Sequence, residues 1–122
     1  MDIIEAIDRF FKNNSTMRVV ALEDARGLVL ALAGSLDLEC SAALQNLLLW
    51  IIEQQNGKLR LIVDLKQVNY ISSTGVGALT IALTTAIKRD KRFLLRNLQP
   101  KVRAVFQLLG LMNFFEEAGL ND

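Results

Sequence analysis

The stretch LIVDLKQVNYISSTGVGAL, residues 61–79, joins the two patterns that decide the fold. Its first residues belong to a branched, almost wholly apolar run, residues 59–65, which is typical of a strand covered on both faces. Its last residues open a longer segment, residues 75–88, whose apolar residues recur at helical spacing. Between them stands a triplet of hydroxyl side chains, residues 72–74, which follows a short polar loop. We place this triplet at the N-terminus of the helix.

The same two patterns alternate along the chain. Strands are predicted near 17–22, 28–33, 59–64 and 92–96, and helices near 2–12, 41–55, 74–88 and 100–109. The polar turn between the first two strands is typical of a hairpin. Alternation of strands with helices predicts the α/β class: one domain with a mixed, four- to five-stranded sheet flanked by helices.

The N-terminal segment predicts an additional amphipathic helix. Asp2 is its expected N-cap, with Glu5 three residues later as in a capping box. We divide the chain into this helix and its linker, residues 1–16, and the main domain, residues 17–119. The apolar stripe of the helix packs either on its own domain or on another subunit, which would give a homodimer.

Composition excludes several kinds of function. The chain has no histidine and a single cysteine, Cys40, so a Ser-His-Asp triad, a histidine metal site and a dithiol centre are excluded. We therefore expect no enzyme, metal or cofactor, and a small apolar role for Cys40. A net charge of +1 offers no field for nucleic acid. Short apolar runs, an acidic start and the lone cysteine predict a cytoplasmic protein without membrane insertion.

The hydroxyl triplet has four readings: a helix cap, a phosphate cradle, a nucleophile and a phosphorylation site. Gly75-Val76-Gly77 suggests a cradle and hence a nucleotide-binding sensor, but a third glycine and a Walker lysine are missing. A nucleophile would lack a histidine base. A phosphate would suit the helix N-terminus, where free N–H groups and the helix dipole favour negative charge.

One face of the 75–88 helix carries no charge before its last turn. Its members are Thr74, Ala78, Ile81 and Thr85. Because a solvated helix face is normally rich in charge, this neutral face indicates a docking surface for another protein.

Two other residues have open roles. Asp64 is expected to end its strand and to bond the backbone of the following loop. Trp50 lies off the main apolar stripe of its helix, so it either completes the packing or contacts a partner.

Three segments together resemble the STAS domain of bacterial anti-sigma factor antagonists. They are GSLDLECSAAL (34–44), LIVDLKQVNYISSTGVGAL (61–79) and VRAVFQLLGLMNFFE (102–116). The resemblance implies a function without catalysis, in which the unphosphorylated protein binds an anti-sigma factor and frees the sigma factor. A serine kinase, often the same anti-sigma factor, then ends binding by phosphorylation, and a phosphatase restores it.

Position by position, the resemblance places the phosphorylated serine at Ser73, with Thr74 and Gly75 after it. We expect Ser72, Thr74 and Gly75 to be partner-binding residues. Ser72 stands where the family usually has an acidic residue, so Ser72 and Thr74 remain alternative acceptors. The family's loop aspartate falls on Asp37, which is either a partner contact or a turn or cap residue. STAS domains also occur in signalling assemblies and beside membrane transporters, so a scaffold or accessory subunit is the alternative function.

Overall fold

The computed structural model describes residues 1–14, 16–54 and 60–122. The strands are β1 (Met17–Asp24), β2 (Gly27–Leu36), β3 (Arg60–Ile71), β4 (Arg92–Arg96) and β5 (Glu116–Glu117). The helices are α1 (Ile3–Phe11), α2 (Leu38–Gln54), α3 (Ser73–Lys88) and α4 (Pro100–Leu108), followed by the 3-10 turn η1 (Met112–Phe114). The predicted α/β class, mixed sheet and extra N-terminal helix are confirmed.

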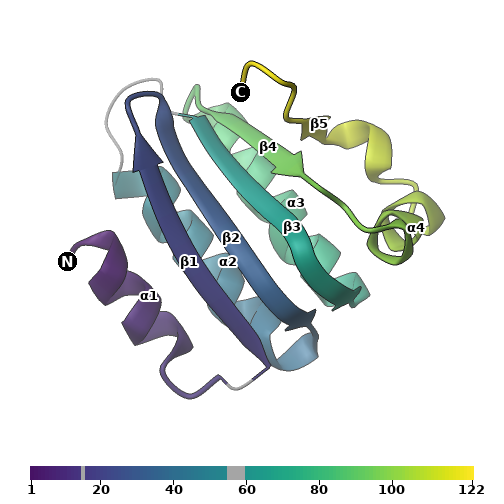
Figure 1. The fold of residues 1–122 in the computed structure, drawn as a ribbon, viewed down its shortest axis with the longest axis horizontal. Helices are drawn as coiled ribbons and strands as arrows, with labels where there is room; N and C mark the ends of the chain where they lie inside the picture. The colour runs from purple at the N-terminus through teal and green to yellow at the C-terminus, as the bar shows by residue number, and fades with distance from the viewer. Residues whose placement is uncertain (15, 55–59) are drawn as a thin grey trace.

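The strands form one sheet in the order β1-β2-β3-β4-β5. β1 and β2 make an antiparallel hairpin, and the later pairs are parallel. Because β2 and β3 run in the same direction, their carboxyl ends meet at one edge of the sheet, where α2 and α3 begin (Figure 1). The hydroxyl triplet therefore lies beside the turn that follows β2.

The main core lies between the sheet and helices α2 and α3, which cover one of its faces (Figure 1). Both helices bury an apolar stripe: Leu44, Leu47, Leu48 and Ile51 from α2, and Val76, Leu79, Leu83 and Ala86 from α3. Within the described residues, each helix falls short of the length and apolar character needed to cross a bilayer.

Helix α1 packs on its own domain, against α2 and β1. Asp2 is its N-cap as predicted, because the carboxylate accepts a hydrogen bond from the Glu5 N–H at 2.8 Å. Ala6 and Phe11 are buried in the main core. A homodimer through α1 would therefore have to use the outer side of the helix, where Ile4 is exposed.

The start of α2 differs from the prediction. The helix begins at Leu38 rather than Ser41, because the Asp37 carboxylate accepts a hydrogen bond from the Cys40 N–H at 3.1 Å and caps the helix earlier. The predicted last residue, Gln55, lies outside the described residues.

The length of β3 also differs. Residues 66–71, expected as a polar loop, continue the strand to Ile71 because they pair with the last residues of β2 across two register shifts. Asp64 therefore lies inside the strand and not at its end, which corrects the prediction. The predicted first residue, Leu59, lies outside the described residues.

Candidate functional site

Ser72 is the N-cap of α3. Its backbone is extended, and its hydroxyl oxygen accepts a hydrogen bond from the Gly75 N–H at 3.1 Å. Its own N–H donates to the carbonyl oxygen of Leu36 at 2.9 Å, which ties the turn to the end of β2. Of the readings of the triplet, the helix cap therefore belongs to Ser72.

The Thr74 hydroxyl belongs to a chain of hydroxyl groups that links the two helix starts. It lies 2.8 Å from the Ser72 hydroxyl and 3.2 Å from the hydroxyl of Ser41 in α2. The Ser41 hydroxyl in turn donates to the carbonyl oxygen of Asp37 at 2.6 Å. Thr74 thus helps to hold α3 against α2.

Ser73 is the first residue of α3 and is exposed. Among the residues that the structure describes, its hydroxyl has no hydrogen-bond partner. It is therefore the member of the triplet whose hydroxyl can react, or be modified, without loss of a contact that holds the turn.

Asp37 lies at the same sheet edge, in the turn between β2 and α2. The hydrogen bond from the Cys40 N–H stabilises its charged form and lowers the pKa of the carboxyl below its usual value. The carboxylate is therefore a helix cap, which was one of its two predicted roles.

The outer face of α3 differs from the predicted docking surface. Ala78 is only 2% exposed and Gly75 is buried, because α3 packs against α2 as well as the sheet and so buries a wide arc. Neither residue can therefore contribute to a surface that a partner touches. On the accessible side of α3, Ser73, Thr74, Ile81 and Thr84 are exposed, and Gly77, Thr80 and Thr85 lie half-buried among them. We call these residues the docking surface; it carries no charge.

The sequence pattern did not predict two exposed apolar side chains at this edge of the sheet. Leu38, in the first turn of α2, is 70% exposed, and Tyr70, two residues before the Ser72 cap, is 54% exposed. The signal for Leu38 was its place directly after a capping aspartate. Tyr70 lies in a segment whose polar residues predict a loop, and a loop pattern does not indicate which way a side chain faces.

Comparison with known proteins identifies the family. The family model described as "Mlab, STAS domain" matches residues 20–117. The chain belongs to the STAS domain family.

Solved structures at low sequence identity share this fold. The unphosphorylated form of the Bacillus anti-sigma factor antagonist SpoIIAA is 24% identical, with a TM-score of 0.71 over 85% of this chain and 90% of that chain. Its phosphorylated form is 23% identical, with a TM-score of 0.65 over 85% and 94%. An anti-sigma factor antagonist from Mycobacterium paratuberculosis is 20% identical, with a TM-score of 0.74 over 88% and 90%.

Gly75 of this STAS domain has a packing role. A Cβ atom at this position would lie 2.8 Å from Leu36 Cγ and 3.0 Å from Ile71 Cγ1, so the glycine lets α3 approach the ends of β2 and β3. A Cβ on Gly77 would meet nothing within 4 Å. Helix–sheet packing therefore accounts for the glycine at position 75 and not for the one at position 77.

Asp64 anchors the segment that follows β4. Burial alone would raise the pKa of its carboxyl, but hydrogen bonds from the Lys66 N–H, Arg96 and Asn97 outweigh this effect and hold the pKa below its usual value. The two Arg96 contacts measure 2.9 and 3.0 Å. Asp64 bonds local backbone as predicted, and in addition joins β3 to β4.

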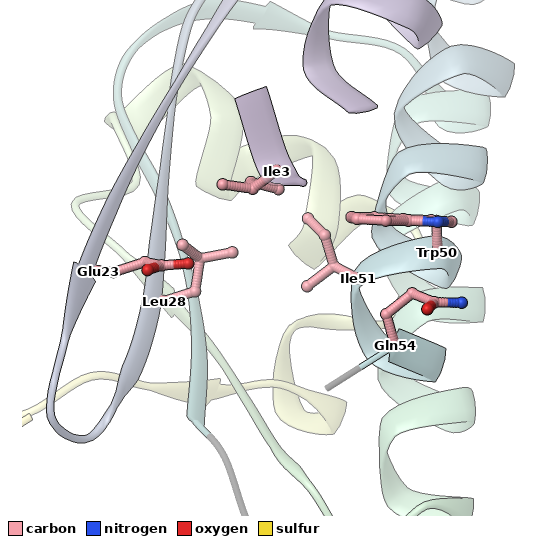
Figure 2. A pocket seen from close by; sticks show the side chains of 6 residues that line it. All are labelled: Ile3, Glu23, Leu28, Trp50, Ile51 and Gln54. Carbon is pink, nitrogen blue, oxygen red and sulfur yellow. The ribbon is translucent and has the colours of Figure 1, made fainter. Parts of the chain in front are cut away.

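Trp50 lines a small apolar pocket between α1, α2 and the hairpin (Figure 2). The other lining residues are Ile3, Glu23, Leu28, Ile51 and Gln54. The cavity volume is about 120 Å³, below the roughly 300 Å³ at which ligand pockets begin. Trp50 is packed against the core, which favours the packing role.

Cys40 is buried at the start of α2, and its thiol lies 3.3 Å from the carbonyl oxygen of Ser35. Burial raises the pKa of this thiol. Within the described residues, no three His, Cys, Asp or Glu side chains are grouped so that they could hold a metal ion.

Proposed function

We propose that this STAS domain is an anti-sigma factor antagonist that acts in the cytoplasm by binding rather than catalysis, and that phosphorylation of Ser73 ends the binding. The observation that carries the proposal is the difference between the three hydroxyls. Ser72 caps α3, Thr74 joins the two helix starts, and Ser73 is exposed without a hydrogen-bond partner among the described residues. A phosphate on Ser73 therefore breaks no contact in the turn.

The fold tolerates a phosphate at this position. Ser73 is the first residue of a 16-residue helix, where free N–H groups and the dipole favour negative charge by about 0.3–1 kcal/mol. Stability is therefore nearly unchanged.

A phosphate on Ser73 would, in contrast, weaken the binding of a partner. The docking surface is neutral, and a phosphate adds a charge of about −1.5 to −2 together with its hydration shell. A partner that covers Ser73 would have to bury that charge unpaired, at several kcal/mol. Since each 1.4 kcal/mol is about tenfold in affinity, we expect a loss on the order of a hundredfold.

The proposed partners are an anti-sigma factor that is also a serine kinase, and a phosphatase that resets the switch. The exposed Leu38 and Tyr70 lie at the same end of the sheet as the start of α3 and supply apolar contact area for such a partner. In support, the similar Bacillus protein has been solved in both an unphosphorylated and a phosphorylated form.

The test uses the anti-sigma factor kinases of the source organism, purified one at a time. Calorimetry should show that Ser73→Ala binds its kinase like wild type and that Ser73→Asp binds on the order of a hundredfold more weakly. Mass spectrometry after incubation with ATP should locate phosphate on wild type and not on Ser73→Ala. Ser72→Ala and Thr74→Ala are the matched controls and should still be phosphorylated.

Two results would contradict the proposal in different ways. If Ser73→Ala is phosphorylated while one control is not, the acceptor is the residue changed in that control. If no kinase phosphorylates the triplet and Ser73→Asp binds as well as wild type, this switch does not exist.

The alternative is an accessory subunit of a larger assembly. It is favoured by exposed apolar side chains outside the docking surface, at the end of α4 and in η1, namely Leu108 and Phe114. Light scattering distinguishes the two functions, because a monomer that binds one small kinase argues against an assembly subunit.

A further inference from the structure

The sheet face opposite α2 and α3 carries a row of apolar side chains that the C-terminal segment covers. Cross-strand pairing aligns Leu22, Val29, Ile62 and Leu94. Val29, Ile62 and Leu94 are buried with Ala118 packed against them, whereas Leu22, at the end of the row, is 59% exposed. We call these four residues the apolar row and residues 116–122 the strap.

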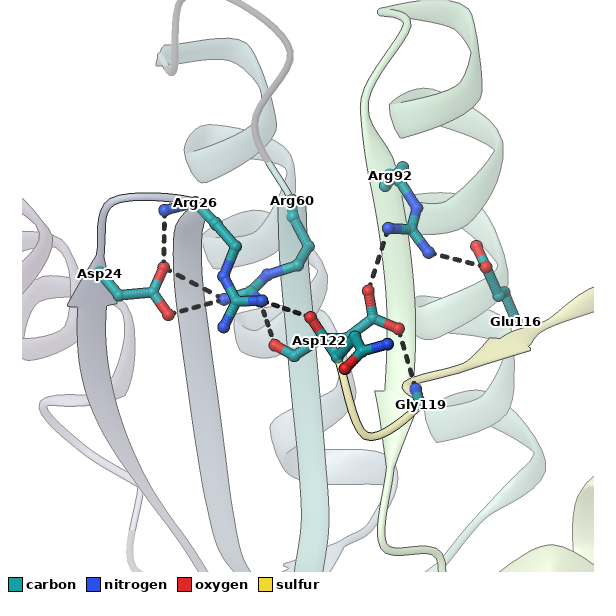
Figure 3. Close-up of polar contacts among 8 residues, drawn as sticks. Asp24, Arg26, Arg60, Arg92, Glu116, Gly119 and Asp122 are labelled. Atoms are coloured by element: carbon teal, nitrogen blue, oxygen red, sulfur yellow. Dashed lines mark hydrogen bonds and ion pairs between the residues drawn. The ribbon is translucent and has the colours of Figure 1, made fainter.

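Beside the apolar row lies a cluster of three arginines (Figure 3). Arg26 stands in the hairpin turn, and Arg60 and Arg92 begin the adjacent strands β3 and β4. Arg60 is only 5% exposed and donates to both carboxylate oxygens of Asp24, at 3.0 and 3.2 Å. Its Nε is buried and has no acceptor among the described residues, so the cluster keeps an unused donor.

The strap binds this arginine cluster through oxygen atoms. Arg92 donates to the Asp122 carboxylate at 3.0 Å and to the Glu116 carboxylate at 2.8 Å. Two further contacts reach backbone carbonyl oxygens of the strap: Arg60 donates to Asp122 and Arg26 to Asn121. Figure 3 shows the Asp122 side chain turned toward Arg92 and the backbone toward Arg60.

The ion pairs that Arg92 makes with the strap are of a kind that opens readily. The side chains of Arg92 and Glu116 are more than half exposed, and such ion pairs each favour the closed state only a few-fold and are screened by salt. Once the strap leaves, Asp24 is the one carboxylate that the described residues still place on the three guanidinium groups, beside an uncovered apolar row. The surface left behind is both basic and apolar.

We propose that this face is a second binding surface, for an acidic peptide segment of a partner, and that the strap occupies it in the unbound protein and is displaced on binding. The choice of occupant rests on charge complementarity with the arginine cluster. The strap itself shows which kind of peptide fits this surface: a small residue, Ala118, covers the apolar row, and two carboxylates bind Arg92. The surface lies at the opposite end of β3 from Ser73, so it stands independently of the phosphorylation switch.

The first arm of the test measures strap opening in the full chain. The Ala118 N–H donates to the Leu95 carbonyl oxygen at 2.8 Å, so its hydrogen exchange reports on the strap. Asp122→Asn should accelerate that exchange a few-fold, since it weakens one charge-assisted contact of the closed strap. Asp8→Asn removes an equal charge from an exposed position on α1 and should leave it unchanged.

The second arm measures binding of the peptide EEAGLND, acetylated, amidated and fluorescently labelled, by anisotropy. Asp122→Asn should bind it a few-fold more tightly than wild type, because its own strap competes less. Adding Arg92→Gln to Asp122→Asn should reduce that binding again. The proposal is overturned if Ala118 exchanges no faster in Asp122→Asn than in Asp8→Asn. It is overturned equally if Asp122→Asn binds no peptide, or binds it regardless of Arg92.

Discussion

Replacing each serine of the hydroxyl turn by alanine separates the cap from the acceptor. Ser72→Ala removes the oxygen that accepts the Gly75 N–H at 3.1 Å, and loss of such a cap costs about 1 kcal/mol, within a range of roughly 0.5–2. Thr74 also loses its 2.8 Å partner but keeps Ser41 at 3.2 Å, so little is added. Ser73→Ala removes an exposed hydroxyl and should change the free energy of unfolding by less than about 0.5 kcal/mol.

Ser72→Asp is the matched control for the same position. A carboxylate oxygen can accept the same Gly75 N–H, and its charge near the helix N-terminus adds about 0.3–1 kcal/mol. We therefore expect Ser72→Asp to equal or exceed the wild type in stability. This also explains how Ser72 can stand where the family usually has an acidic residue, since both side chains cap a helix.

Urea unfolding followed by circular dichroism measures these differences, provided that the slope with denaturant is the same for all variants. For a chain of this size, 1 kcal/mol corresponds to roughly 3–5 °C in the melting temperature. If Ser73→Ala destabilises the protein as much as Ser72→Ala, the assignment of cap and free hydroxyl is wrong.

Three further predictions concern buried groups. Gly75→Ala should destabilise the fold because its Cβ would meet Leu36 at 2.8 Å, whereas Gly77→Ala should stabilise it by about 0.5–1 kcal/mol; equal effects in urea unfolding would contradict the packing role of Gly75. Asp64→Asn should cost about 1–3 kcal/mol at neutral pH. Because the folded-state pKa of Asp64 is lowered, its contribution is present above the unfolded value of about 3.9 and is lost as pH falls through the folded value, so the wild-type advantage should shrink in acid. The Cys40 thiol should resist a disulfide reagent in the native state and react at once in guanidinium, since burial both shields it and raises its pKa; rapid native reaction would refute this.

The sequence predicted those features of the site whose causes are local. A hydroxyl before a glycine-containing apolar helix is enough to specify a cap, and α3 begins at Ser73 as the pattern requires. Likewise β4 spans residues 92–96 as predicted, and Pro100 begins α4. In each case the residues that determine the feature are close neighbours in the sequence.

Features that depend on distant partners could not be predicted in this way. Residues 66–71 look like a loop because Lys66, Gln67 and Asn69 are polar, yet pairing with β2 keeps them extended. Ala78 looks exposed on a helical wheel, because periodicity gives the direction of a buried face but not its width. The width is set by the packing of α3 against both α2 and the sheet.

The two proposed surfaces lie at opposite ends of one rigid element. Arg60 begins β3, which is 12 residues long, and Ser72 and Ser73 follow directly after its last residue. At about 3.3 Å per residue this separates the arginine cluster from the phosphorylation site by roughly 35–40 Å, several times the Debye length of about 8 Å at physiological salt. β3 is paired to β2 on one side and to β4 on the other, so it cannot shift without breaking both ladders. We therefore expect that a phosphate on Ser73 would act on its own docking surface and leave the strap unchanged, and that an acidic segment at the arginine cluster would leave the proposed switch unchanged.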